Sequence, residues 1–225
     1  MGTAIGSALT QAVGVAISPL PVVLVILMLV SKRARVNGPA FVAGWVVATL
    51  GVSAVAFALA DAADAGTPNS GGAEGVNGLQ VVLGLAFLAL AVRQFRSRPA
   101  AGEAPTTPKL FDAVDSMGGA KAFLLGAAGC AANPKNLPLA ISAGTTVAVT
   151  GAAGGTAAVA LVAFVLVASA TVIMPVVVYF ALGERSVRLL DGWKAWLVAN
   201  NATIMTVLFT VLGANLLADG LALFS

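Results

Sequence analysis

Long stretches without a charged residue alternate with short polar connections along the whole chain. A helix that crosses a bilayer needs about 20 predominantly apolar residues, so the 48-residue uncharged run at 136–183 is long enough for two. The glycine-rich segment GAAGG at 151–155 is the expected turn between them. The pattern therefore predicts six membrane spans, at about residues 4–30, 38–60, 77–95, 119–147, 156–181 and 200–221.

The composition agrees with a membrane protein. Hydrophobic residues make up 59% of the 225 residues and charged residues 9%, whereas a soluble domain carries roughly 25% charged residues. The chain has no histidine and one cysteine, Cys130, which rules out an internal disulfide and a His or Cys metal cluster. It also has no long basic run of the kind that binds nucleic acid. We therefore expect an all-α polytopic membrane protein with no cofactor, no metal and no nucleic-acid partner.

The basic residues define the orientation of the spans. Eleven of the twelve lysines and arginines fall in three connections, and cytoplasmic loops carry such an excess of basic residues. These are Lys32, Arg33 and Arg35 after the first span, Arg93, Arg96, Arg98, Lys109 and Lys121 around the connection from the third span to the fourth, and Arg185, Arg188 and Lys194 after the fifth. The three connections are therefore expected to be cytoplasmic, and both termini extracytoplasmic.

The connection at 96–118 divides the chain into two halves of three spans each. Its sequence RPAAGEAPTTPKLFD is rich in proline, alanine and threonine, as is typical of a flexible linker. We expect a first three-helix repeat at 1–95, a cytoplasmic linker at 96–118 and a second three-helix repeat at 119–225. With three spans per half, the second half enters the membrane in the opposite sense to the first, which predicts a 3+3 inverted repeat.

The first span of each half is interrupted by two prolines. Residues 18–21 read SPLP and residues 133–138 read NPKNLP. Paired proline-interrupted spans at corresponding positions indicate a transporter's binding site near the middle of the membrane, although such prolines also occur as simple kinks. We expect the two breaks to meet there, with free N–H groups and positive helix ends that attract an anion. The candidate substrate-binding residues are Ser18, Pro19, Pro21, Asn133, Pro134, Lys135, Asn136 and Pro138.

Lys135 is the one basic residue deep inside a predicted span, because Arg93 and Lys121 each lie two residues from a span end. It follows Lys121 by 14 residues, about 21 Å along a helix, which is too deep for easy access to the cytoplasmic surface, although a snorkelling lysine is the alternative interpretation. Apart from Asp219 at the outer end of the last span, no predicted span contains an acidic residue, so the partner of Lys135 is a backbone carbonyl, Asn133, Asn136, Ser18 or a bound anion. If Lys135 is an unpaired anion ligand, Lys135→Ala impairs transport much more than folding.

The motifs resemble those of a known family. The duplicated six-span layout resembles the lysine-exporter (LysE) superfamily. Within it, SPLPVVLVILML, NPKNLPLAISAG and the last span, WLVANNATIMTVLFTVLGANLLADGL, are similar to the peptidoglycolipid-addressing and sulfolipid-addressing proteins. The resemblance implies export of lipid-linked or glycolipid material toward the envelope from a bacterial inner membrane. Some relatives in the superfamily carry a thiol relay, which needs two thiols, and this chain has one. Cys130 and the spaced Gly126 and Gly129 instead favour close helix packing.

These features favour a membrane transporter that exports or flips an anionic, lipid-linked or glycolipid substrate toward the cell envelope. The alternatives are a non-catalytic accessory subunit of a larger envelope-lipid export system and an exporter of a small amino-acid-like solute. A membrane enzyme is disfavoured because no acid–base pair, nucleophile–histidine pair or metal motif is present. A homo-oligomer and a larger lipid-export machinery are both compatible with so small a bundle.

Overall fold

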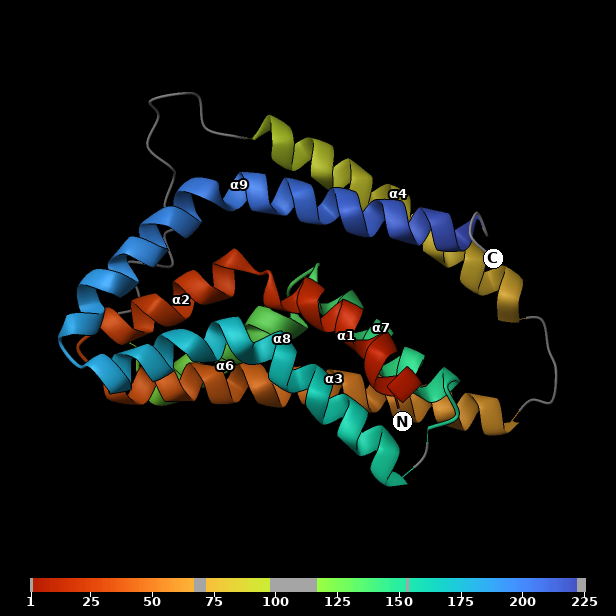
Figure 1. The fold of residues 1–225 in the computed structure, drawn as a ribbon, viewed down its shortest axis with the longest axis horizontal. Helices are drawn as coiled ribbons and strands as arrows, with labels where there is room; N and C mark the ends of the chain where they lie inside the picture. The colour runs from red at the N-terminus through yellow and green to blue at the C-terminus, as the bar shows by residue number, and fades with distance from the viewer. Residues whose placement is uncertain (1, 67–71, 98–116, 153, 222–225) are drawn as a thin grey trace. The chain divides into compact units, whose positions relative to one another are not determined.

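The structure is a computed structural model that describes residues 2–66, 72–97, 117–152 and 154–221. Every regular element in these ranges is a helix, as predicted (Figure 1). The helices are α1 (Gly2–Ala16), α2 (Pro19–Val30), α3 (Ala34–Gly66), α4 (Gly72–Arg96), α6 (Gly119–Ala131), α7 (Asn136–Val149), α8 (Gly154–Leu182) and α9 (Arg185–Gly220).

Three of the described helices are long and apolar enough to cross a membrane, within α3, α8 and α9. The pair α1 and α2 forms a fourth candidate span with a bend of 59° at its break. Helices of this length and composition identify a membrane protein. A helix or a broken pair lies at each of the six predicted positions, but α6 and α7 are shorter apolar helices and α4 does not meet the same test. The count of six spans stays a prediction.

The chain forms two compact units, each of which takes helices from both predicted halves. The first consists of Met1–Gly66 and Thr107–Val198, and the second of Thr67–Thr106 and Ala199–Ser225. The first unit contains both broken pairs together with α3 and α8, and the second contains α4 and the later part of α9. The predicted linker at 96–118 lies mostly outside the described residues.

In the first unit, α3 packs against α6 and α7 with almost no space between the backbones. A Cβ added to Gly44 of α3 would collide with the Phe123 carbonyl, and one added to Gly126 of α6 would collide with the Phe41 carbonyl. Cys130 is fully buried in the same helix. The predicted close packing at Gly126 and the packing role of Cys130 are therefore confirmed, and small residues let these helices approach as they do in membrane proteins.

The other broken pair of the first unit packs in a corresponding way. Helix α8 lies against α1 and α2, with Thr171 in contact with Ala16 and Tyr179 beside Leu29. These pairs show that α8 runs in the same direction as the pair it covers. The second helix of each predicted half thus packs on the broken helix of the other half.

The second unit contains an antiparallel pair of helices with reciprocal contacts. A Cβ on Gly84 of α4 would come within 2.8 Å of the Leu217 side chain, and one on Gly213 of α9 within 2.9 Å of the Leu88 side chain. The Phe87 and Phe209 rings lie 5.6 Å apart, centroid to centroid. Each glycine therefore faces the leucine four residues beyond the glycine of the other helix, which is the arrangement that a local two-fold axis produces.

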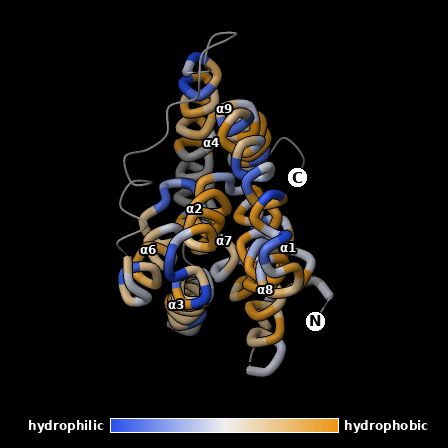
Figure 2. Tube along the Cα trace, turned by 90° about the vertical axis from the view of Figure 1, so that its left-hand side faces the viewer, coloured by the Kyte–Doolittle hydropathy of each residue, from blue (hydrophilic) through white to orange (hydrophobic). Residues whose placement is uncertain are grey.

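The three predicted cytoplasmic connections reach one end of the first unit. Asn37 Nδ2 donates to the Met117 carbonyl at 3.0 Å, which holds the start of α3 beside the residues that precede α6. The turns after α2 and after α8 line one pocket at this end. Figure 2, viewed from this end, shows hydrophilic residues at helix ends and hydrophobic residues along the helices. The position of the three connections at one end agrees with their lying on one side of the membrane. That this side is the cytoplasmic one stays a prediction.

Candidate functional site

The first helix break leaves two backbone carbonyls without their usual helical donors. Helix α1 ends at Ala16, and Pro19 begins α2. The Ile17 carbonyl faces a missing donor because the residue four positions later is Pro21, which has no N–H. The Gly14 carbonyl loses its donor because the Ser18 N–H binds the Ala16 carbonyl instead, at 2.9 Å. In a membrane such carbonyls need partners from the protein itself.

Lys135 from the second break supplies the missing donor to both carbonyls. Its Nζ donates to the Gly14 carbonyl at 2.8 Å and to the Ile17 carbonyl at 2.7 Å. The side chain is buried, with 1% of its surface exposed. Among the partners considered from the sequence, the structure thus selects backbone carbonyls. The charge of Lys135 is tolerated at this depth because it is bound by carbonyls of the first break, which contains Pro19 and Pro21.

The second break is closed by its own asparagine. The Asn133 side-chain oxygen accepts the Lys135 N–H at 3.0 Å and the Asn136 N–H at 3.4 Å, and its carbonyl accepts the Leu137 N–H at 3.0 Å. Asn133 therefore closes the turn that leads into α7, with side-chain bonds of the kind that asparagine makes near helix starts. The exposed Pro134 and half-buried Pro138 flank these contacts and donate no backbone hydrogen bond.

Asn136 makes a second link between the breaks. This residue is fully buried, and its Nδ2 donates to Ser18 Oγ at 3.2 Å and to the Gly129 carbonyl at 3.1 Å. Its Oδ1 is buried and has no hydrogen-bond partner among the described residues. Ser18, Lys135 and Asn136 are thus brought together as expected, across 117 to 118 positions of sequence.

A third polar contact comes from α8 and was not among the candidate residues. Thr171 Oγ1 donates to the Ala16 carbonyl at 2.7 Å, at the end of α1. Ser169, on the same stretch of α8, is fully buried, and its hydroxyl has no hydrogen-bond partner among the described residues. A hydroxyl residue in an apolar span is the sequence signal for such a contact, but sequence alone does not tell which carbonyl it meets.

The contacts correct two expectations. The start of α7 does not offer free N–H groups, because Asn133 accepts those of Asn136 and Leu137. The start of α2 offers few, because Pro19 and Pro21 have none. Lys135 is also not an unpaired charge, because its Nζ donates to two carbonyls. The premise for expecting its removal to leave folding nearly unchanged therefore does not hold, and the effect on folding stays a prediction. In this arrangement the donors of Lys135 and Asn136 are bound by acceptors of the two breaks, while Asn136 Oδ1 has no partner among the described residues.

The comparison with known protein families gives one match over nearly the whole chain. The model of the family described as Sap, sulfolipid-1-addressing protein, matches residues 9–222. The matched range contains both breaks and every candidate residue. No curated protein and no solved structure matches the chain.

Proposed function

Because the chain belongs to the sulfolipid-1-addressing protein family, we propose that it is a membrane transporter that moves an anionic, lipid-linked or glycolipid substrate toward the cell envelope. The family description supports a role in addressing a lipid, and the long apolar helices support a site of action in the membrane. In this proposal the protein is a transporter and not an enzyme, and its substrate is its main partner.

The buried ammonium group of Lys135 is the observation that carries the proposal. A charge in the middle of a membrane helix costs about 2.5–3.5 kcal/mol on insertion scales, and such residues usually face a substrate path. Within the described residues, Lys135 forms no ion pair and is bound by carbonyl dipoles alone. A full negative charge would bind this ammonium more strongly than a neutral carbonyl does. The site therefore favours an anionic group.

The proposed mechanism is an exchange of partners at Lys135. An anionic headgroup replaces the Gly14 and Ile17 carbonyls on the ammonium, and the two breaks lose one of their direct links. Among the described residues, the hydrogen bond from Asn136 to Ser18 is then the remaining side-chain link between the two motifs, and at 3.2 Å this bond is easily broken. Binding of the substrate would thus free the two broken pairs to move against each other, as alternating access requires.

The hydrocarbon part of the substrate need not enter the protein. An apolar groove of about 570 Å³ runs between α3 and α7 and is lined by residues such as Val55, Leu59 and Ile141. In the proposal an acyl chain lies along this groove or stays in the bilayer, while only the headgroup passes the breaks. The apolar lining makes contact with a chain favourable without a specific hydrogen bond.

The reciprocal packing supports a 3+3 inverted repeat of six spans. Helix α3 covers the broken pair α6 and α7, and α8 covers the broken pair α1 and α2. Helix α4 and the later part of α9 contact each other through matching glycines and leucines. Each of these helix contacts has an equivalent contact in which the helices of the two halves are exchanged, as an inverted repeat predicts. We place this bundle in the bacterial inner membrane with both termini extracytoplasmic.

An accessory subunit of a larger lipid-export system is the second candidate. The observation in its favour is that the donors of Lys135 already have good partners, so the residue also suits a purely structural link between the breaks. An accessory role predicts that the purified chain binds lipid but does not move it across a bilayer.

Lipid analysis of cells that lack the protein tests the proposed function. The inner-membrane and outer-envelope lipids of the deletion strain are compared with those of strains that produce the wild-type chain, Lys135→Met or the exposed-lysine control Lys121→Met. We expect one anionic lipid to accumulate in the inner membrane of the deletion and Lys135→Met strains only. Loss of a chemical modification from a lipid would instead indicate an enzyme and contradict transport.

A further inference from the structure

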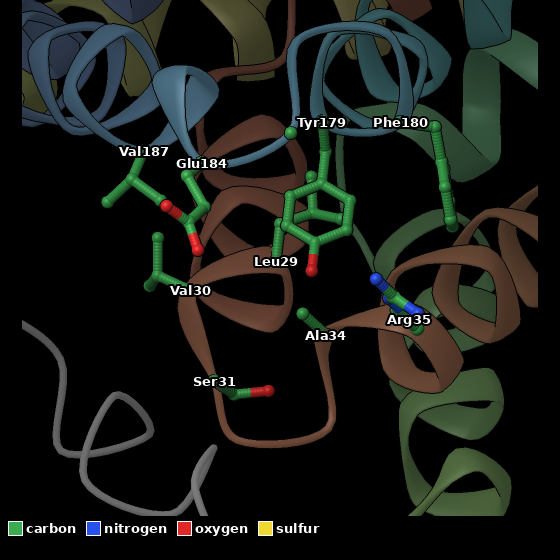
Figure 3. Close-up of a pocket in the computed structure, with 10 residues that line it drawn as sticks. Leu29, Val30, Ser31, Ala34, Arg35, Tyr179, Phe180, Glu184 and Val187 are labelled. Carbon is green, nitrogen blue, oxygen red and sulfur yellow. The ribbon is translucent and has the colours of Figure 1, made fainter.

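A pocket at the end of the first unit is separate from the helix breaks. Its volume is about 540 Å³, and it lies between the turn that joins α2 to α3 and the turn that joins α8 to α9 (Figure 3). The apolar side of its lining includes Leu29, Val30 and Val187. Its functional groups are those of Arg35, Tyr179 and Glu184. Neither the sequence motifs nor the mechanism above uses these three residues.

The polar groups of this pocket have unused hydrogen-bonding capacity. Ser31 also lines it, but its hydroxyl already donates to the Met28 carbonyl at 2.8 Å. In contrast, no hydrogen bond or ion pair within the described part of the chain engages the side chains of Arg35, Tyr179 or Glu184. Figure 3 shows the Tyr179 ring between the Glu184 carboxylate on one side and the Arg35 guanidinium on the other, with its hydroxyl directed toward Ala34.

The position of the pocket places it where headgroups lie. Helix α2 has 12 residues, which corresponds to about 18 Å of rise. The Lys135 contacts lie before its first residue, and the pocket begins at its last turn. If the breaks are near the middle of the membrane, the pocket is therefore at its surface, since half of the hydrocarbon core is about 15 Å thick. The exposed Lys32 and Arg33 in the adjoining turn agree with this depth.

We infer that this pocket binds the hydroxyl-bearing headgroup of an anionic lipid. The planar guanidinium of Arg35 suits a phosphate or sulfate group, with which it can form two parallel hydrogen bonds. The Tyr179 hydroxyl can donate to the same group. Glu184 repels a bare anion but accepts hydrogen bonds from sugar or glycerol hydroxyls, so it favours a headgroup that carries both. The apolar side of the lining suits the adjoining glycerol and the first carbons of the acyl chains.

This inference rests on the proposed function in one respect. If the chain transports a lipid, the pocket is the place where that lipid is first bound. The pocket and Lys135 lie at opposite ends of α2, so a headgroup released from the pocket has about 18 Å to travel along one helix. Binding at the pocket can nevertheless be measured without any transport. Failure of one idea is therefore distinguishable from failure of the other.

Photocrosslinking of a lipid to the full chain tests the inference. The protein is placed in phosphatidylcholine nanodiscs that contain phosphatidylglycerol with a photoreactive group close to its headgroup, and crosslinked peptides are identified by mass spectrometry. We expect crosslinks at residues 29–35 and 179–187. Arg35→Gln should weaken binding about tenfold or more, because it removes a charge-assisted hydrogen bond. Tyr179→Phe should weaken it less and in the same direction.

Arg33→Gln is the matched control, because it removes the same charge two residues earlier in the chain, from a side chain that does not line the pocket. It should weaken binding by at most about fivefold, the effect of one basic residue near an anionic surface. Equal losses in the two arginine variants would overturn the inference. Displacement of the lipid by inorganic phosphate would also overturn it, since the pocket would then bind a bare dissolved anion.

Discussion

The buried ammonium of Lys135 and the free carbonyls of the first break are each unfavourable alone, and each compensates for the other. A buried ammonium needs acceptors, and a helix interrupted by prolines has spare carbonyls. The Lys135 Nζ meets the Gly14 and Ile17 carbonyls at 2.8 and 2.7 Å. If the lysine is lost, the carbonyls remain buried without donors. The same bonds that stabilise the break therefore hold the ammonium ready for exchange with an anion.

The first prediction concerns the stability of this link. Lys135→Met keeps the length of the side chain and removes the ammonium, so the Gly14 and Ile17 carbonyls lose their donor. We expect a loss of stability of about 1.5–3 kcal/mol, the contribution of a hydrogen bond to a charged group. The measurement is the melting temperature in detergent. Lys121→Met, which changes an exposed lysine on α6, serves as the control and should melt like the wild type. Equal melting temperatures for all three proteins would show that the carbonyl contacts do not contribute.

At the scale of helices, close packing along α3 holds the second broken pair in place. Gly44 faces the backbone of α6 around Phe123, and Gly144 of α7 faces the Ser53 carbonyl of α3. A broken helix has fewer internal hydrogen bonds than a continuous one, so it relies more on its neighbours. The tight contact with the continuous α3 meets that need on both sides of the break.

The second prediction tests this contact with two substitutions in one helix. Gly44→Ala introduces a methyl group that collides with the Phe123 carbonyl, and overpacking of this kind costs about 1–3 kcal/mol. Gly51→Ala adds the same methyl group to the same helix, but nothing lies within 4 Å of it. We expect Gly44→Ala to lower the melting temperature and Gly51→Ala to leave it unchanged or raise it. A similar effect of both would contradict the close approach of α3 and α6.

The helix positions and both breaks could be predicted because they depend on local sequence. Uncharged runs mark the helices, and SPLP and NPKNLP mark the interruptions. The partner of Lys135 could not be predicted, because four kinds of acceptor were compatible and only the fold shows which carbonyls it reaches. The expectation of free N–H groups at the start of α7 was wrong for a local reason. The Asn133 side-chain oxygen accepts the N–H groups of Lys135 and Asn136.

The grouping of helices into units also escaped sequence reasoning. The predicted halves follow chain order, whereas the compact units pair elements from both halves. The glycines at 84 and 213 each precede a leucine by four residues, and the structure shows that these two patterns face each other. A pattern that short is too common in apolar helices to identify a partner.

At the scale of the whole molecule, the orientation in the membrane is the main open prediction. The three basic connections are expected on the cytoplasmic side, and the N-terminus on the other. Cys130, the one cysteine of the chain, is fully buried and is first replaced by alanine. In this background, Gly2→Cys or Lys32→Cys places a single thiol at an exposed position. An impermeant maleimide should label Gly2→Cys in intact spheroplasts and Lys32→Cys only after permeabilisation. The reverse pattern would mean that the bundle is inserted the other way round.

The transbilayer movement of a labelled anionic lipid in vesicles with the purified protein tests the central claim most directly. Fluorescent phosphatidylglycerol is the probe, an impermeant quencher reports which leaflet it occupies, and the assay runs without a gradient and with a proton or a sodium gradient. We predict that the wild-type chain speeds the movement under at least one condition, while Lys135→Met behaves like protein-free vesicles and Lys121→Met like the wild type. Movement no faster than in protein-free vesicles under every condition, with lipid binding intact, would contradict a transporter that works alone and favour an accessory subunit.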